Sequence, residues 1–261
     1  MSENLYQTPQ SNVNRTNLGS AVLGSIKSVP ISHGSSWIGE SWRLFKSQPG
    51  VWIGMLLVYG ILAIVANVIP IGNYAFGVIA PIFSGGWMIA AVNCDRDSSA
   101  KFDNLFAGFS TNAGTLAMVG VITVVLQLAI GVVVGLMFAA GTGASGIAQF
   151  FTMLNNPEQA ATMMPTFMLM ILVFLALLIP VMMLAWFAPV LVVQHNLGAW
   201  DAMQRSFIAC MKNILPFTWY SILFVLLSFV AMIPLGLGLL AVLPMAIIAI
   251  YCAYKDIFLD A

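Results

Sequence analysis

The stretch Phe167-Met-Leu-Met-Ile-Leu-Val-Phe-Leu-Ala-Leu-Leu-Ile-Pro-Val-Met-Met-Leu-Ala-Trp-Phe-Ala-Pro-Val-Leu-Val-Val193 decides the fold class, because it contains no Asp, Glu, Lys, Arg or His. About 20 apolar residues let a helix cross the hydrocarbon core of a bilayer. Backbone groups in lipid must bond within the protein, which leaves helices and closed barrels as the possible structures. The stretch lacks the alternating pattern of a barrel strand, so it predicts a transmembrane helix.

The rest of the chain has the same character. Hydrophobic residues make up 61% of it and charged residues 7%, whereas about 25% of the residues in a soluble domain are charged. Five further spans are predicted, at Val51–Val68, Ile71–Val92, Leu116–Ala139, Ile214–Ile233 and Leu235–Tyr254. We therefore expect an all-α, polytopic bundle of six transmembrane helices, formed by a single domain over residues 36–258.

The amino-terminal residues differ in composition from this domain. Residues 1–35 are rich in Ser, Asn and Gln and lack a long apolar run, which predicts a disordered cytoplasmic tail. A secretory signal begins with basic residues and continues into an apolar core. The opening Met1-Ser-Glu-Asn-Leu-Tyr-Gln7 is acidic and polar instead, so we expect no cleavage.

The basic residues predict the orientation of the chain. All nine lie before the first span, after the second, after the fourth or after the sixth, at Arg15, Lys27, Arg43, Lys46, Arg96, Lys101, Arg205, Lys212 and Lys255. Positive charge is retained in the cytoplasm, which predicts cytoplasmic amino and carboxyl termini and an outward loop over residues 140–165. The nine acidic residues cancel the basic ones, so a nucleic acid partner, which needs a basic excess, is not expected.

The sequence also suggests three repeats, over about residues 36–96, 101–196 and 199–258. In each, an amphipathic segment precedes a pair of spans, and the corners Ile69-Pro-Ile-Gly72 and Ile233-Pro-Leu-Gly236 match closely. Amphipathic helices of this kind lie in the membrane interface, with aromatic rings at headgroup depth. The predicted interfacial anchors are Trp37, Trp42, Phe102, Phe106, Trp200 and Phe207.

Several residues within the spans are candidates for a solute pathway or for helix packing. They are Pro81, Gln127, Gly131, Gly135, Pro189 and Pro244. A buried amide such as that of Gln127 commonly forms an interhelical hydrogen bond, and two glycines four residues apart let helix backbones approach closely. For Gly131 and Gly135 packing within the chain is favoured, and contact with a second copy is the alternative. Prolines in spans free backbone carbonyls, which either line a cavity or only shape the bundle.

The sequence gives little support for catalysis. No ionisable residue falls in the middle of a predicted span, where such residues usually mark ion or proton pathways. His195, Asp201 and Cys210 are near one another in sequence, but Asp201 and Cys210 would lie on opposite sides of one helix. Phosphate-binding loops and nucleophile elbows are absent from the sequence. We expect a protein that is not an enzyme.

Sulfur-containing residues do not change this expectation. Met164, Met168 and Met182 share a helix face and resemble a copper path. However, Met168 and Met182 would lie roughly 21 Å apart along the helix. We therefore expect no cofactor and no metal site. The three cysteines fall near the reducing face, so disulfides are not expected either.

Several motifs resemble an uncharacterised family of six-span inner-membrane proteins of proteobacteria, over about residues 35–258. They are Pro49-Gly-Val-Trp-Ile-Gly54, Ile69-Pro-Ile-Gly72 to Ala80-Pro-Ile-Phe83, Asn104-Leu-Phe-Ala-Gly-Phe109, Trp186-Phe-Ala-Pro189 and Ala199-Trp-Asp-Ala-Met-Gln-Arg-Ser-Phe207. The last motif is also similar to a looser group of bacterial integral membrane domains. The resemblance implies a multi-pass protein of the bacterial inner (cytoplasmic) membrane, and it brings no catalytic residues.

Two functions are consistent with these features of the sequence. The first is a non-enzymatic scaffold or accessory protein that organises lipids or other membrane proteins, with homo-oligomers included. The alternative is a transporter or channel for a small neutral or amphipathic solute, with a pathway between the repeat units.

Reporter fusions test the predicted orientation. A reporter placed at Asn155 should behave as extracytoplasmic, and one placed after Lys255 should behave as cytoplasmic, because the basic residues are held on the side of synthesis. The opposite pair of signals would overturn the assignment.

Overall fold

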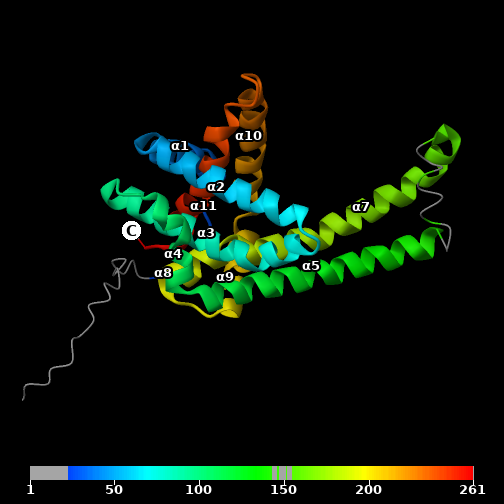
Figure 1. Cartoon of the computed structure of the whole chain (residues 1–261), viewed down its shortest axis with the longest axis horizontal. Helices are drawn as coiled ribbons and strands as arrows, with labels where there is room; N and C mark the ends of the chain where they lie inside the picture. Colours follow the sequence, from blue (N-terminus) through cyan, green and yellow to red (C-terminus); the bar gives the residue numbers. More distant parts are fainter. Residues whose placement is uncertain (1–22, 143–145, 147–150, 152–154, 261) are drawn as a thin grey trace, which may run out of the picture.

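The computed structural model describes residues 23–142, 146, 151 and 155–260. The described residues form helices joined by short connections (Figure 1). The elements are α1 (His33–Ser47), α2 (Pro49–Val68), α3 (Gly72–Asp97), η1 (Phe102–Phe106), α4 (Ala107–Thr111), α5 (Ala113–Thr142), α7 (Pro157–Trp186), α8 (Ala188–His195), α9 (Ala199–Lys212), α10 (Ile214–Met232) and α11 (Leu239–Phe258).

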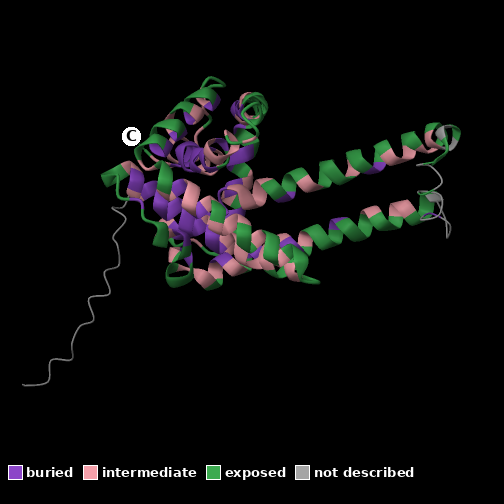
Figure 2. Ribbon diagram, turned by 45° about the horizontal axis from the view of Figure 1, so that its top comes forward, coloured by how far each residue is buried: buried purple, intermediate pink, exposed green. Residues whose placement is uncertain are grey.

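Six helical segments of the described chain are long and apolar enough to cross a membrane, which confirms the six predicted spans. They are Pro49–Val68, Gly72–Asp97, Ala113–Gly141, Ala160–His195, Ile214–Met232 and Leu239–Phe258. Their burial differs widely, because 56% of the apolar window is buried in α3 and in α11 but only 11 to 17% in the other four spans. Thus α3 and α11 form the core, and the other spans consist largely of exposed and half-buried residues (Figure 2).

Aromatic stacking and close backbone contact hold the other helices against α3. The ring of Trp52 on α2 stacks on that of Trp87, with the centroids 5.9 Å apart. On α5, a Cβ added to Gly120 would lie 2.1 Å from the carbonyl oxygen of Val78. Only glycine allows this approach, so α5 begins in tight contact with α3.

The fourth predicted span breaks at Phe187, between α7 and α8. Pro189 sits in the first turn of α8, and a proline there cannot continue the hydrogen bonds of the preceding helix. Ser206 of α9 provides hydrogen bonds to backbone groups at the break. Its hydroxyl accepts a hydrogen bond from the Phe187 backbone N–H at 2.9 Å and donates one to the Met183 carbonyl at 2.6 Å.

The amino-terminal segment corrects the prediction of a disordered tail through residue 35. Leu23 pairs with Leu259 in an antiparallel bridge, and the Gly24 N–H donates to the Phe258 carbonyl at 2.9 Å. The buried side chain of Asn213 also accepts a hydrogen bond from the Val29 N–H and donates one to the Lys27 carbonyl. Long-range hydrogen bonds that local composition does not reveal therefore order residues 23–32, and α1 begins at His33. Residues 1–22 of the predicted tail lie outside the described part.

A charged cluster joins the ends of α1, α3 and α11. Asp95 receives Arg43 Nη2 at 2.8 Å on one carboxylate oxygen and Lys255 Nζ at 2.6 Å on the other. Lys255 also contacts Glu40 at 2.9 Å, and the Tyr251 hydroxyl donates to Asp95 at 3.1 Å. The hydrogen bond from Arg43 to Asp95 raises the pKa of this guanidinium. We call these five residues the base cluster.

The prediction of Trp37 as an interfacial anchor is wrong. Its side chain is 2% exposed, its ring packs 5.1 Å from that of Phe217, and its indole N–H donates to Asp256 at 2.9 Å. The apolar stripe of α1 therefore faces α10 and α11, because these helices supply both an apolar surface and a carboxylate acceptor. On the same helix, Trp42 remains exposed.

The structure does not confirm three equivalent repeats. The two matching corners agree locally, since Ile71 and Leu235 occupy the same motif position and both have positive φ angles, of 67° and 55°. The hairpin of α10 and α11, however, rises from the body in a different direction from α5 and α7 (Figure 1). The middle amphipathic segment is also shorter than expected, because it consists of η1 and the five-residue α4.

Asp95→Ala tests the base cluster. The change leaves two cations without their shared carboxylate, and we expect a loss of about 2 to 3 kcal/mol in the free energy of unfolding, less than for a fully buried pair. Asp97→Ala is the control, because Asp97 is exposed at the same end of α3, and should change stability by less than about 0.5 kcal/mol. Unfolding in mixed micelles measures both, and equal losses would contradict the role of Asp95.

Ser206→Ala tests the repair of the break at Phe187. The variant leaves the buried Phe187 N–H unpaired and leaves the Met183 carbonyl with only the contact from Cys210 Sγ at 3.8 Å, and it should cost about 1 to 3 kcal/mol of stability. Ser221→Ala on α10 removes an exposed hydroxyl that bonds only within its own helix, so this control should behave like the wild type. A Ser206→Ala protein as stable as the control would show that the break needs no repair.

Candidate functional site

α5 and α7 form an arm that extends beyond the rest of the described protein (Figures 1 and 2). Each helix has 30 residues, or about 45 Å at 1.5 Å per residue. Their outer parts carry many exposed apolar side chains, such as Val132, Leu136, Leu172 and Leu175. The arm therefore presents a long apolar surface, and clefts lie along it.

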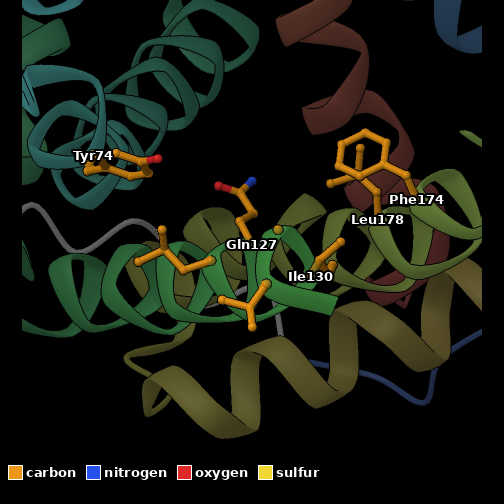
Figure 3. Close-up of a pocket in the computed structure, with 8 residues that line it drawn as sticks. Tyr74, Gln127, Ile130, Phe174 and Leu178 are labelled. Atoms are coloured by element: carbon orange, nitrogen blue, oxygen red, sulfur yellow. The ribbon is translucent and has the colours of Figure 1, made fainter. Parts of the chain in front are cut away.

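The larger cleft lies where the arm meets the start of α3. It has a volume of about 610 Å³ and is lined by Tyr74 of α3 and by Phe174 and Leu178 of α7. From α5 it is lined by Gln127, Leu128, Ile130, Gly131 and Val132. In Figure 3 the Gln127 side chain points from α5 into the space between Tyr74 and Phe174. An amide and a phenol thus face an otherwise apolar cleft.

A second cleft of about 450 Å³ continues between α5 and α7, and both Gly131 and Gly135 line it. Apart from the backbone of α5 itself, no heavy atom of the described residues lies within 4 Å of a Cβ added at either glycine. The prediction that these glycines pack within the chain is therefore wrong for the described residues, because they border open clefts instead of a helix contact. Contact with a second copy remains a prediction.

A third, inner cavity of about 330 Å³ lies among the helices near the body. Its walls come from α2, α3, α5, α7, α8 and α11, and they include Trp87, Trp186, Gln127 and Pro189. Gln127 lines both this inner cavity and the larger cleft. The amide therefore lies at the boundary between the two spaces. No hydrogen bond from its side chain is found among the described residues, so the expected interhelical bond is not seen.

The predicted site residues divide into two groups. Gln127, Gly131, Gly135 and Pro189 all border the clefts or the inner cavity, whereas Pro81 within α3 and Pro244 within α11 are not among the residues lining them. Of the predicted interfacial anchors other than Trp37, Phe207 is half-buried and the rest are exposed, namely Trp42, Phe102, Phe106 and Trp200.

The residues considered for nucleophilic chemistry are not brought together. Cys210 is buried, which raises the pKa of its thiol to about 12 and keeps it protonated at neutral pH. Asp201 is exposed, and His195 Nε2 lies 2.6 Å from the hydroxyl of Tyr254. Among the described residues, no three His, Cys, Asp or Glu side chains are placed to hold a metal ion.

Sequence reasoning missed Trp87, Trp186 and Tyr74 as lining residues. A signal was present for the two tryptophans, because tryptophan in membrane proteins is enriched at the interfaces. Both instead fall inside predicted apolar stretches. A tryptophan inside a span departs from this tendency, and the departure could have directed attention to both residues.

The comparisons with known proteins agree with this architecture. A probable inner membrane protein of Burkholderia thailandensis is 24% identical over 209 residues, which cover 77% of this chain and 75% of the relative. The chain matches no family model and no solved structure. The similarity and the six apolar helices together support the resemblance to six-span inner-membrane proteins, and the chain is a multi-pass protein of the inner membrane.

Proposed function

We propose that this chain is a non-enzymatic scaffold that organises lipids and partner membrane proteins along the arm of α5 and α7. The observation that carries the proposal is the open face of the arm, where Gly131 and Gly135 border two clefts with no protein atom close to them. In lipid, apolar exposure alone gives little drive to associate, and close packing at small residues becomes decisive. The glycine face is therefore suited to receive another helix or an acyl chain.

The opposite end of the molecule supports the same proposal. Helix α9 buries a face of small residues, such as Ala202 and Ala209, against the body. Its opposite face exposes Trp200, Ile208 and Met211. Amphipathic helices with exposed aromatic rings bind the headgroup region. These side chains would anchor the body while the arm extends through the apolar layer.

A transporter of a small neutral or amphipathic solute is the second candidate. It is favoured by the position of Gln127, which lines both the larger cleft and the inner cavity. A solute could exchange between the two spaces past this amide. Flux of such solutes through purified protein in vesicles, reduced by Gln127→Leu, would favour transport over the scaffold.

Cross-linking in native membranes tests the scaffold. A photo-reactive amino acid at Val132, whose side chain is 61% exposed, should capture a second copy or the same membrane protein or lipid in repeated experiments. Combining it with Gly131→Leu and Gly135→Leu should lower the yield at least fivefold, because the added side chains fill the face without meeting protein atoms. Mass spectrometry of the adducts provides the measurement.

Gly60→Leu on α2 is the matched control, since a Cβ there also meets no heavy atom within 4 Å but lies outside the arm. It should leave the cross-linking yield unchanged. Adducts that differ from one experiment to the next would contradict the scaffold. So would a cross-linking yield that falls as much in the Gly60→Leu control as in the arm variants.

A further inference from the structure

The amide of Gln127 lies at the midpoint of the apolar span Ala113–Gly141, which contains no charged residue. Gln127 is exposed, and its side chain points into the larger cleft (Figure 3). The amide forms no hydrogen bond with another described residue. Lipid tails neither donate nor accept hydrogen bonds, so a polar group that faces them without a partner is unfavourable. The amide therefore needs a polar partner that the described residues do not supply.

Tyr74 of α3 brings a second polar group to the same cleft. Tyr74 is 44% exposed, and Figure 3 shows its side chain and that of Gln127 pointing toward one another from the two sides of the cleft. Its hydroxyl also forms no hydrogen bond with another described residue. Because both residues are exposed to the cleft, a ligand in the cleft can reach the amide and the hydroxyl together.

The second cleft continues this site between α5 and α7. Gly131 and Phe174 line both clefts, so the two spaces adjoin. The described lining of the second cleft has no polar side chain, and it includes Phe138 and Phe167, whose ring centroids lie 6.1 Å apart. A helix with its side chains is about 10 to 12 Å across, too wide to pass between helices that this ring contact joins. An acyl chain is thin enough, so it is the better of the two occupants for the glycine face.

The charge of the lining limits the head of such a lipid. Neither cleft is lined by a charged side chain in the described part of the chain. A charged group in the apolar layer is costly unless it is paired, so the clefts favour an uncharged head. Their volumes, of about 610 and 450 Å³, lie in the range of small-molecule sites.

We propose that the two clefts bind one neutral single-chain lipid. Its hydroxyl or ester head bonds to Gln127 and Tyr74, and its chain lies along Gly131 and Gly135. A monoacylglycerol has this chemistry, because the amide can donate to the ester carbonyl and accept from a hydroxyl, and the phenol can do either. The inference rests on the proposed function, since it takes the glycine face of the arm to be open, and it names the class of lipid that the arm holds.

Three photo-reactive probes test the site on the full chain in nanodiscs. All carry the same diazirine-bearing hydrocarbon chain, with the head of a monoacylglycerol, with that of a lysophosphatidylglycerol, or with no head. We expect the monoacylglycerol to label residues 131–138 and 167–174 about fivefold more than the other two, the effect of roughly one neutral hydrogen bond. Mass spectrometry of the labelled peptides provides the measurement.

Variants of the two polar residues separate the head from the chain. Gln127→Leu and Tyr74→Phe together should reduce labelling by the monoacylglycerol to that by the headless chain, whose own labelling should not change. Neither variant removes a hydrogen bond between described residues, so both should unfold like the wild type. Tyr74→Phe alone, which keeps the ring, should lower the preference in part. Tyr59→Phe is the matched control, because Tyr59 of α2 lines neither cleft, and it should keep the full preference.

Equal labelling by the monoacylglycerol and the headless chain would overturn the proposal. So would stronger labelling by the lysophosphatidylglycerol, labelling outside the arm, or a loss of preference in Tyr59→Phe equal to that in Tyr74→Phe. Cross-linking at Val132 distinguishes this failure from that of the scaffold. Repeated capture of one partner protein there, without a preference for the monoacylglycerol, keeps the scaffold and overturns this site. A preference for the monoacylglycerol, with protein adducts at Val132 that vary between experiments, supports the site and contradicts the scaffold.

Discussion

The carboxylate of Asp95, shared between Arg43 and Lys255, is the interaction on which the arrangement of the helices depends. It joins three elements that are far apart in sequence, and it does so where their apolar surfaces end. The side chain of Asp95 is 17% exposed and that of Lys255 is 27% exposed, so water weakens this pair less than an ion pair on an open surface. The base cluster thus fixes α1 and α11 against α3. The adjacent Asp256 accepts a further hydrogen bond from Trp37 of α1, and Asn213 holds the amino-terminal segment.

The arm of α5 and α7 differs from the base in the surface that it presents. Its inner part packs on α3 through Gly120, and its outer part carries exposed apolar side chains such as Val132, Leu136 and Leu172. Its apolar side chains pack as well against lipid as against protein, because lipid tails are as apolar as leucine. The molecule therefore combines a base whose helices are held together by polar contacts with an arm whose apolar side chains face the membrane. A protein that organises partners would present its binding face on such an arm.

The spans could be predicted from the sequence because length and apolar composition are sufficient to identify them. Which face of each span meets protein could not, since lipid-facing and protein-facing positions are equally apolar and carry no periodic contrast. This explains the error at Gly131 and Gly135, and a similar ambiguity on the amphipathic α1 explains the error at Trp37. A small-residue pattern indicates that close approach is possible but does not name the neighbour, and an aromatic stripe fits a headgroup surface as well as the surface of α10 and α11. The ordering of residues 23–32 depends on Asn213 and on the carboxyl terminus, so composition alone missed it.

The lipid accessibility of α5 tests the account most directly. Nitroxide labels placed one at a time along α5, in nanodiscs that hold a single copy, report collision with oxygen dissolved in the apolar layer. We predict high accessibility on the face of Gly131 and Gly135, and low accessibility at Ile130, which is 8% exposed, and near Gly120 on the side toward α3. Accessibility at Gly131 and Gly135 as low as that at Ile130 would show that the glycine face is packed inside the bundle, and would contradict the account.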